Sequence, residues 1–175
     1  LGTFVAGKRA ESRIEAQRVR SFEEQMEEAG IHIGFRLLAF DRETAPAAVA
    51  AALKIAAGAP VYRLRRLRLM GGEPIGLEDR SMPERIGAAI SAAALVSRPA
   101  TTMIEAALGA PLGGISVTVG ALAAEAQVAR ELGVRRGSPL LMRAHTFYDQ
   151  AGKPVLCGES IYRGDRYQFT YGFGE

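Results

Sequence analysis

The sequence predicts an α+β domain built around one mainly antiparallel, six-stranded sheet. The main observation is an internal repeat, in which residues 52–61 match residues 131–140 with Leu, Ile or Val, Gly and Pro recurring in register. The second is that a run with strand character and then a glycine turn follow each copy. The third is the length of 175 residues, which suits one domain with a sizeable core.

Each repeated unit is predicted to run strand, helix, strand, strand. The expected segments of the first unit are a strand at 35–42, a helix at 47–54 and a hairpin that turns at 71–74. Those of the second unit are a strand at 115–122, a helix at 123–132 and a hairpin that turns at 151–154. Pro46 is tolerated at a helix start, and Gly133 suits the left-handed residue that ends a helix. Two such units supply six strands and place two crossover helices on one face.

Three more helices are expected outside the repeated units. The first begins at Ser21, whose hydroxyl forms a capping-box pattern with the carboxylate of Glu24, and it ends at Gly30. The other two cover residues 83–95 and about 101–108. Residues 1–20 show no clear periodicity, and we interpret them as a tether to an upstream part.

Composition excludes several classes of protein. Hydrophobic residues make up 48% of the chain and charged residues 23%, values typical of a protein that folds in water. No apolar run approaches the ~20 residues of a membrane span, so we expect no membrane partner. Acidic residues are interspersed with the basic ones despite a net charge of +3, so these residues alone do not indicate nucleic-acid binding. The first residues lack the pattern of a targeting peptide, and we expect a cytoplasmic protein.

Few residues are available for metal or catalytic chemistry. The single cysteine, Cys157, cannot form an internal disulfide, and together with His32 and His145 it falls short of a four-ligand zinc site. The sequence contains no Gly-x-Ser-x-Gly element, phosphate loop or dinucleotide fingerprint. We therefore expect no metal, no cofactor and no catalytic residue, with His145 packed on its strand and Cys157 buried.

Two arginines are the main candidates for ligand binding. Alternation along residues 61–70 places Arg66 and Arg68 on one face of a strand, about 7 Å apart. Guanidinium groups are permanently charged and offer paired donors, so the two can hold one phosphate or carboxylate together. The alternative interpretation is a pair of solvated surface charges, which is how most strand arginines behave.

The position of Glu78 depends on the length of the first hairpin loop. A loop of three residues, Gly71 to Glu73, makes Glu78 face Arg66, whereas a loop of two residues turns it to the other face. Beside two cations, this carboxylate could select ligand hydroxyls or an amine. It could equally form a plain cross-strand ion pair.

Two helix starts add hydroxyl groups. Ser21 opens a helix whose free N–H groups favour a negative ligand, although capping alone also explains a serine there. Thr101 and Thr102 follow Pro99 and present the same two interpretations, capping or contact with an anion.

Several motifs resemble GntR-type bacterial regulators. In chain order they are residues 1–6 (LGTFVA), the Ser21-Phe22 helix start with its Gly30 end, residues 66–68 (RLR), 73–74 (EP), 77–83 (LEDRSMP), 132–141 and 162–169 (YRGDRYQF). The first motif resembles the end of a winged helix-turn-helix. The rest resembles the UTRA effector-binding domain of the HutC subfamily, and the last motif is the most specific. The resemblance divides the chain into the end of a wing and a linker at 1–20 and a UTRA domain at 21–175.

The resemblance implies a chorismate lyase-like fold, a homodimer and a small anionic metabolite as the effector. Operator DNA would be bound through an upstream domain absent from this chain. In sugar-phosphate-binding relatives, the ligand contacts match Ser21, Arg66, Arg68, Glu78 and Tyr162, with a hydroxyl near Thr101 or Thr102. One departure concerns Leu156, which stands where those relatives carry a glutamate, so an amino-sugar phosphate is in doubt. Residues 77–80 also resemble histidine-utilisation regulators, which respond to urocanate.

Three functions follow from these observations. The preferred one is the sensory half of a transcriptional regulator. The alternatives are a chorismate lyase-like enzyme acting on an aryl carboxylate, and a purely structural dimerisation module with a filled core.

Overall fold

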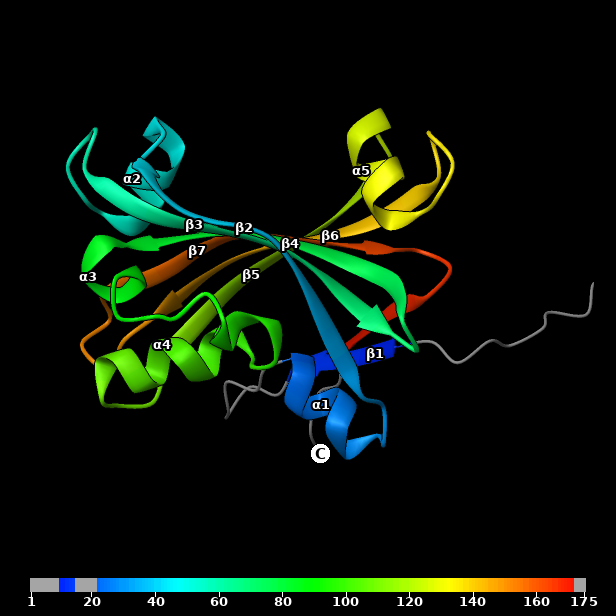
Figure 1. Ribbon diagram of the computed structural model, residues 1–175, viewed down its shortest axis with the longest axis horizontal. Coiled ribbons are helices and arrows are strands. Elements are labelled where there is room, and N and C mark those ends of the chain that lie inside the picture. Colours follow the sequence, from blue (N-terminus) through cyan, green and yellow to red (C-terminus); the bar gives the residue numbers. More distant parts are fainter. Residues whose placement is uncertain (1–9, 15–21, 172–175) are drawn as a thin grey trace, which may run out of the picture.

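One antiparallel sheet in the order β2-β3-β4-β7-β6-β5 forms the centre of the molecule (Figure 1). The computed structural model describes residues 10–14 and 22–171. The strands of this sheet are β2 (Ile33–Thr44), β3 (Pro60–Met70), β4 (Glu73–Pro83), β5 (Gly114–Ala123), β6 (Pro139–Tyr148) and β7 (Pro154–Arg163). The helices are α1 (Phe22–Glu28), α2 (Ala47–Leu53), α3 (Glu84–Gly87), a 3₁₀ turn η1 (Ala94–Val96), α4 (Ala100–Leu108) and α5 (Ala126–Leu132).

The predicted duplication is confirmed. The first unit is β2-α2-β3-β4 and the second is β5-α5-β6-β7, so the sheet is six-stranded and antiparallel as expected. Backbone conformation repeats as well: Lys54 and Gly133, which align in the repeat, both adopt the left-handed conformation that ends a helix. Gly58 and Gly137, also aligned, both have positive φ. The two units therefore share their turns as well as their sequence pattern.

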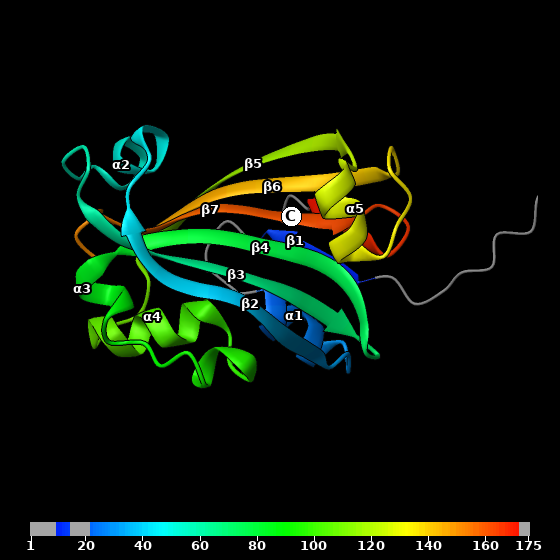
Figure 2. The ribbon, with the colours of Figure 1, turned by 45° about the horizontal axis from the view of Figure 1, so that its top comes forward.

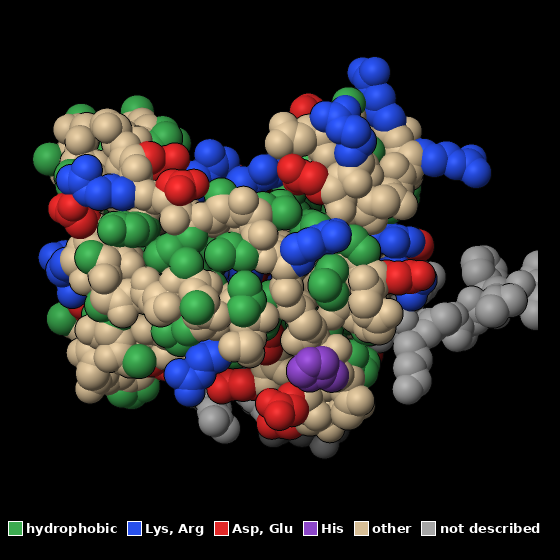
Figure 3. Space-filling model, viewed as in Figure 1, with side chains coloured by type: hydrophobic (Ala, Val, Ile, Leu, Met, Phe, Trp, Pro, Cys, Tyr) green, Lys and Arg blue, Asp and Glu red, His purple; other side chains and the backbone are tan. Residues whose placement is uncertain are grey.

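The helices of the two units lie on the same face of the sheet and interlock the units (Figure 1). Leu53 of α2 packs in one cluster with Cys157, which belongs to β7 of the second unit. Leu132 of α5 packs in another cluster with Leu67 and Leu77, which belong to the first unit. Each helix thus buries its apolar side against strands of the other unit. A space-filling view shows a hollow between the two lobes that surround α2 and α5 (Figure 3).

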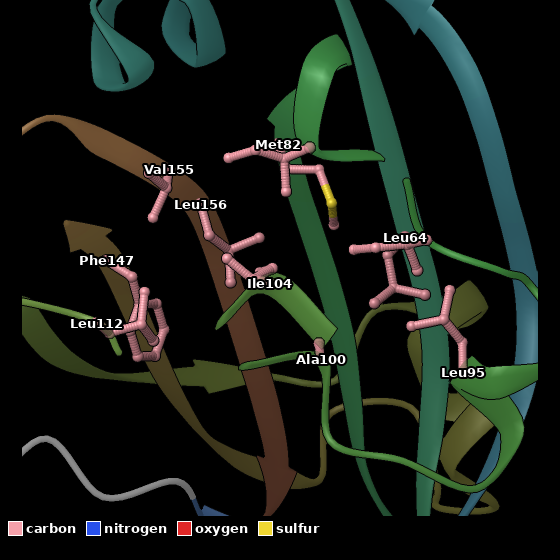
Figure 4. Packing of buried hydrophobic residues seen from close by; sticks show 11 residues of the cluster. Leu64, Met82, Leu95, Ala100, Ile104, Leu112, Phe147, Val155 and Leu156 are labelled. Atoms are coloured by element: carbon pink, nitrogen blue, oxygen red, sulfur yellow. The ribbon is translucent and has the colours of Figure 1, made fainter. Parts of the chain in front are cut away.

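The opposite face of the sheet is covered by α1, α3 and α4 (Figures 1 and 2). The largest hydrophobic cluster lies there, and Figure 4 shows Ile104 of α4 packed beside Leu156 of β7. Met82 and Leu64 fill the β4 and β3 side of the same cluster, and all four side chains are completely buried. This packing covers one end of the face, whereas α1 covers the other end with Phe22 and Met26. None of the helices in the part of the chain that the structure describes is long and apolar enough to cross a bilayer.

The first hairpin reaches the expected register by a different route. Gly71 and Gly72 alone form the turn, both with positive φ, so the loop of three residues is wrong. A bulge then places one extra residue, Ile75, between the partners of Arg68 and Leu69. The second hairpin carries a register shift at the equivalent place, where Val155 is the extra residue. Both extra residues are completely buried, so the bulge itself contributes to the core.

The helix expected at 83–95 is wrong, because the structure breaks it into α3 and η1. Gly87 of α3 packs so closely on Tyr62 that a Cβ atom there would lie 2.3 Å from that side chain. Further along, the carbonyl oxygen of Leu95 accepts a hydrogen bond from the buried side chain of Arg66 at 2.7 Å. After α3 the amides of Ala89 and Ile90 bond to the carbonyls of Ile86 and Gly87, three residues back, so the α-helical pattern of bonds four residues apart does not continue.

Strand pairing near the two ends of the described chain was not expected from the sequence. Strand β1 (Ala10–Ile14) pairs in parallel with β8 (Tyr167–Tyr171) and forms a separate two-stranded sheet. Ala10 is completely buried in the same cluster as Phe22 and Met26 of α1. Part of the segment interpreted as a tether is therefore packed against the domain.

The close approach of β4 and β7 at Gly158 yields a prediction. This residue has φ of 144°, and a Cβ atom there would lie 2.2 Å from the backbone oxygen of Asp79. We expect Gly158→Ala to lower the free energy of unfolding by roughly 2 kcal/mol or more, because backbone must shift in the middle of the sheet. Gly114→Ala is the matched control, since nothing lies within 4 Å of its Cβ position, and it should leave stability nearly unchanged. Urea unfolding of both variants measures the difference, and equal losses would contradict this account.

Candidate functional site

A row of polar residues crosses four strands on the face covered by α1 and α4. Arg66 of β3 pairs with Glu78 of β4, Glu78 pairs with Ser160 of β7, and Ser160 pairs with Arg143 of β6. Residues directly opposite each other in an antiparallel sheet point to the same side, so alternation on each strand produces this row. The neighbouring row contains Arg80, Gly158 and His145, and β4 and β7 approach each other closely at this glycine.

Glu78 is the centre of a buried charge cluster. Its side chain is completely buried, and its Oε2 atom accepts a short hydrogen bond from Nε of Arg66. Its Oε1 atom lies 2.9 Å from Nη2 of Arg68 and 2.7 Å from Nη2 of Arg80. Burial would raise the pKa of Glu78, but the charges of the three guanidinium groups hold this pKa well below its usual range. The carboxylate is therefore ionised and holds three arginines in place.

Arg66 is held by two backbone carbonyls and an aromatic ring as well as by Glu78, although its Nη2 atom has no hydrogen-bond partner among the described residues. Its Nη1 atom donates to the carbonyl oxygen of Leu95 at 2.7 Å and to that of Arg98 at 2.8 Å. Its guanidinium also lies 3.7 Å from the centre of the Phe35 ring. The interpretation of Arg66 and Arg68 as solvated surface charges is wrong, because both side chains are at most 1% exposed. The predicted alternation that places them on one face is correct.

Arg68 reaches a different set of partners. Its Nη1 atom donates to the hydroxyl of Tyr162 at 2.8 Å and to that of Ser160 at 3.2 Å, and its Nε donates to the carboxylate of Glu23 at 2.7 Å. Gly76 lies between Arg68 and Tyr162 in the sheet, and a Cβ atom there would meet the tyrosine ring at 2.7 Å. Burial would lower the pKa of Arg68, but the charges of Glu23 and Glu78 raise it above its ordinary value.

A small cavity of about 30 Å³ opens beside this cluster. That volume exceeds the roughly 10–15 Å³ that one ordered water needs, and it is too small for a sugar phosphate. Its polar lining consists of Glu23, Arg68, Arg80, Thr101, Arg143, His145, Ser160 and Tyr162. Within the described residues, Nε of Arg80 has no hydrogen-bond partner, although that side chain is only 6% exposed. The cavity therefore has a buried cation in its lining, and one N–H donor of this cation, at Nε of Arg80, has no partner among the described residues.

His145 supplies the cavity with a neutral ring. Its Nδ1 lies 3.2 Å from the carbonyl oxygen of Arg143 and must donate, because a carbonyl can only accept. The Nε2 atom is then an acceptor, is buried, and has no partner among the described residues. Burial first, and then the charge of Arg80, lower the pKa of His145 well below its ordinary value of 6.5. This ring therefore stays neutral at physiological pH and offers a lone pair to a ligand donor.

The structure brings together most of the residues that the sequence analysis proposed. Arg66, Arg68, Glu78 and Tyr162 form one cluster, and Thr101 lies buried at the cavity. Thr102 is exposed on α4, and Ser21 lies outside the described residues. Leu156, which replaces a glutamate of the relatives, is completely buried in the hydrophobic cluster under α4 (Figure 4).

Five polar lining residues were missed by reasoning from the sequence: Glu23, Arg80, Arg143, His145 and Ser160. Arg80 is two residues beyond Glu78, so the alternation used for β3 would have placed it on the same face of β4. Arg143 and His145 are related in the same way on β6. Glu23 lies on α1, and nothing in the spacing of a helix reveals which strand residue its side chain will reach.

A second cavity of about 470 Å³ lies on the other face, between α2 and strands β5, β6 and β7. Its lining includes Val49, Thr118, Cys157 and also His145, but none of the ligand contacts proposed from the sequence. Burial raises the pKa of the Cys157 thiol to about 11, so the thiol stays protonated and unreactive.

Comparisons with known proteins agree with this arrangement. Residues 28–168 match the family model of the UTRA domain. The chain is 28% identical over 170 residues to the HTH-type transcriptional repressor NagR of Bacillus subtilis, covering 97% of this chain and 69% of that protein. It is 30% identical over 175 residues to the HTH-type transcriptional regulator Rv0792c of Mycobacterium tuberculosis, covering 97% of this chain and 62% of that protein. The crystal structure of the effector domain of PhnF from Mycobacterium smegmatis superposes with a TM-score of 0.79 at 25% identity, covering 89% of this chain and 95% of that one. The predicted chorismate lyase-like fold is confirmed.

The buried cluster predicts a large effect at Glu78 and a small one at its neighbour. Glu78→Gln should lower the free energy of unfolding by about 3–5 kcal/mol, because three buried guanidiniums lose their shared anion. Asp79→Asn is the matched control: Asp79 bonds Arg63 and Arg65 on the other face, where its side chain is 24% exposed, and the loss should be about 1 kcal/mol or less. Urea unfolding measures both, and similar losses would contradict a central role for Glu78.

The neutral ring of His145 predicts a pH dependence of stability. Because its pKa is lowered in the folded state, the unfolded chain binds a proton that the folded chain excludes, so stability falls as the pH drops below about 6.5. The slope from this residue reaches at most about 1.4 kcal/mol per pH unit. His145→Gln should remove that part of the slope between pH 6.5 and 5, whereas His32→Gln, at an exposed position, should keep it. Unfolding at several pH values tests this, and identical profiles for both variants would contradict it.

Proposed function

The chain belongs to the UTRA domain family, the effector-binding domain of GntR-family transcriptional regulators, and we propose that it senses a small anionic metabolite at the cavity beneath α1 and α4. The observation that carries the proposal is the charge of the buried cluster. Arg66, Arg68 and Arg80 carry three positive charges, and Glu78 and Glu23 carry two negative ones. A buried net positive charge is costly unless an anion compensates it. A ligand acid beside Arg80 supplies that anion.

The cavity also favours a hydrogen-bond donor on the ligand. The acceptor at Nε2 of His145 needs a hydroxyl or an N–H group, and Thr101 and Ser160 offer hydroxyls that can donate or accept. The effector is therefore an acid with a neighbouring donor, such as a hydroxy acid, a phosphosugar or an aryl acid with a ring N–H. Glu78 then acts mainly by positioning the arginines, while Tyr162 positions Arg68. Phe147 and Ile115 form part of the apolar lining, and Leu156 lies in the same hydrophobic cluster as Phe147, so no carboxylate from that position is offered to an amino-sugar group.

Sensing requires that the cavity enlarge. At about 30 Å³ the described state is closed, so a metabolite binds only when a covering helix shifts. Binding changes the affinity for DNA only if the metabolite has different affinities for the closed and the opened arrangement.

In this proposal, residues 1–20 are the end of the wing of an upstream DNA-binding domain and a linker, and residues 21–175 form the sensor. Ser21 would contribute a hydrogen-bond donor at the start of α1, and Thr102 would contribute one at the start of α4. Two copies of this HutC-type regulator would pair in the cytoplasm and bind operator DNA as a homodimer.

The relatives support a regulator over an enzyme. The matched proteins are named as transcriptional regulators, and the chain spans 69% of one and 62% of the other. The remaining length of such proteins accommodates a DNA-binding domain. The chorismate lyase-like alternative would require turnover of an aryl acid.

A thermal-shift screen tests the proposed site. Phosphosugars, hydroxy acids, phosphonates and urocanate-like acids are added to the wild-type chain and to Arg143→Met, which removes a cation from the cavity lining. A true effector at 100 times its Kd adds roughly 2.7 kcal/mol, or roughly 5–10 °C in Tm, and we expect Arg143→Met to lose most of this shift.

The control and the competing functions are read from the same screen. Arg136→Met removes an exposed arginine in the loop that follows α5 and should keep the full shift. Helix α5 itself lies on the opposite side of the sheet from α1 and α4 (Figure 1). Absence of any shift would favour a purely structural dimerisation module. Chromatography of the shifted samples separates the enzyme alternative, because product released from an aryl acid would contradict a sensor.

A further inference from the structure

The ion pair between Glu23 and Arg68 differs from the other ion pairs in the charge cluster. Glu78 and its arginines all lie on neighbouring strands of one sheet, whereas Glu23 belongs to α1, a separate element. Its side chain is 11% exposed and lies at the edge of the cavity. One carboxylate of the cluster is therefore mounted on an element that can move without breaking the sheet.

Helix α1 contacts the site through aromatic packing and through Arg68. Phe22 packs with its ring centre 5.4 Å from that of Tyr162, and Met26 is buried in the same cluster. The guanidinium of Arg68 lies 4.9 Å from the centre of the Phe22 ring and bonds Glu23. A helix of seven residues is not stable in isolation, so α1 keeps its place through these contacts. Loss of the Glu23 contact weakens the hold of the sheet on α1.

Arg68 lines the same small cavity as Arg80, so an acid that bound beside Arg80 would also meet Arg68, whose Nε is already occupied by Glu23. The carboxylate of Glu23 presents the same chemistry as a ligand acid, namely an anionic oxygen at 2.7 Å from a guanidinium nitrogen. Two anions cannot share that nitrogen, and repulsion between them in a buried site is strong. Ligand and Glu23 therefore compete for Arg68.

We propose that the Glu23 carboxylate occupies the position on Arg68 that the acidic group of the effector takes on binding. Effector binding then displaces Glu23 from Arg68 and releases α1. This inference rests on the proposed acid-binding function and adds the group that an acid must displace. It also explains how a closed cavity of about 30 Å³ opens, since the element that leaves is the one that carries the competing charge. Part of the binding free energy of the effector is used to displace α1. The apparent affinity therefore equals the intrinsic affinity multiplied by the fraction of chains in which Arg68 is free of Glu23.

Inorganic phosphate is the probe for the test, because it carries only the acidic group. Its Kd is measured by titration calorimetry at constant ionic strength for the wild-type chain, Glu23→Gln, Glu27→Gln and Arg143→Met. Glu27 is exposed on the same helix, so its replacement changes the net charge equally without touching Arg68. We expect Glu23→Gln to bind phosphate at least about tenfold more tightly than the wild type and Glu27→Gln to bind it as the wild type does.

Hydrogen exchange supplies a second measurement that needs no variant. Added phosphate should lower the protection of the amides of α1 in the wild-type chain while the strands that line the cavity gain protection. Equal or weaker phosphate binding by Glu23→Gln, or α1 protection that rises with phosphate, would overturn the proposal. If binding is equal in the wild type and Glu23→Gln but lost in Arg143→Met, the proposal fails and the acid site stands. If no form binds phosphate, the proposal also fails, and the acid screen decides the proposed function separately.

Discussion

The arrangement of the site depends on one buried carboxylate. Glu78 lies at the centre of the sheet with three guanidinium groups around it, and each of those groups comes from a neighbouring position on β3 or β4. Without this anion the arginines would repel one another in a region with little water, and the polar row could not pack beneath helices. The same ion fixes what lies outside the sheet, because Arg66 holds the carbonyls of Leu95 and Arg98 and so determines the path of the chain before α4.

The duplication places different side chains at equivalent positions of the site. Counted from the aligned prolines Pro60 and Pro139, Arg66 in the first unit corresponds to His145 in the second. Counted from the prolines that open the return strands, Glu78 corresponds to Gly158 and Arg80 to Ser160. At these positions the first unit supplies full charges, and the second supplies a neutral ring, a hydroxyl or no side chain. One backbone plan used twice thus provides both the charged cluster and the neutral hydrogen-bonding groups beside it.

Sequence reasoning recovered the parts of the fold that have a period. The repeat predicted the two units, and alternation predicted that Arg66 and Arg68 share a face, because both patterns are local properties of strands. The sequence left two options open for the face on which Glu78 lies. The observed register results from a two-residue turn whose effect is compensated by the bulge at Ile75, and neither feature can be read from the sequence. The pairing of β1 with β8 and the contact of Glu23 with Arg68 join distant segments, and their residues show no period that links them.

The interlocked packing of α2 and α5 has a bearing on how the chain acquires its structure. The two units meet at the pairing of β4 with β7, and each crossover helix finds its apolar partners on the opposite unit, so neither half holds a complete core by itself. A nascent chain that has emerged only as far as β4 carries Glu78 and its arginines on a sheet edge that water still reaches. These charges lose their hydration only when β7 arrives, half a chain later, with Ser160 and Tyr162. Pairing between strands so distant in the sequence makes folding slow. It also delays the burial of Glu78 and its arginines until the groups that compensate their loss of hydration have been synthesised.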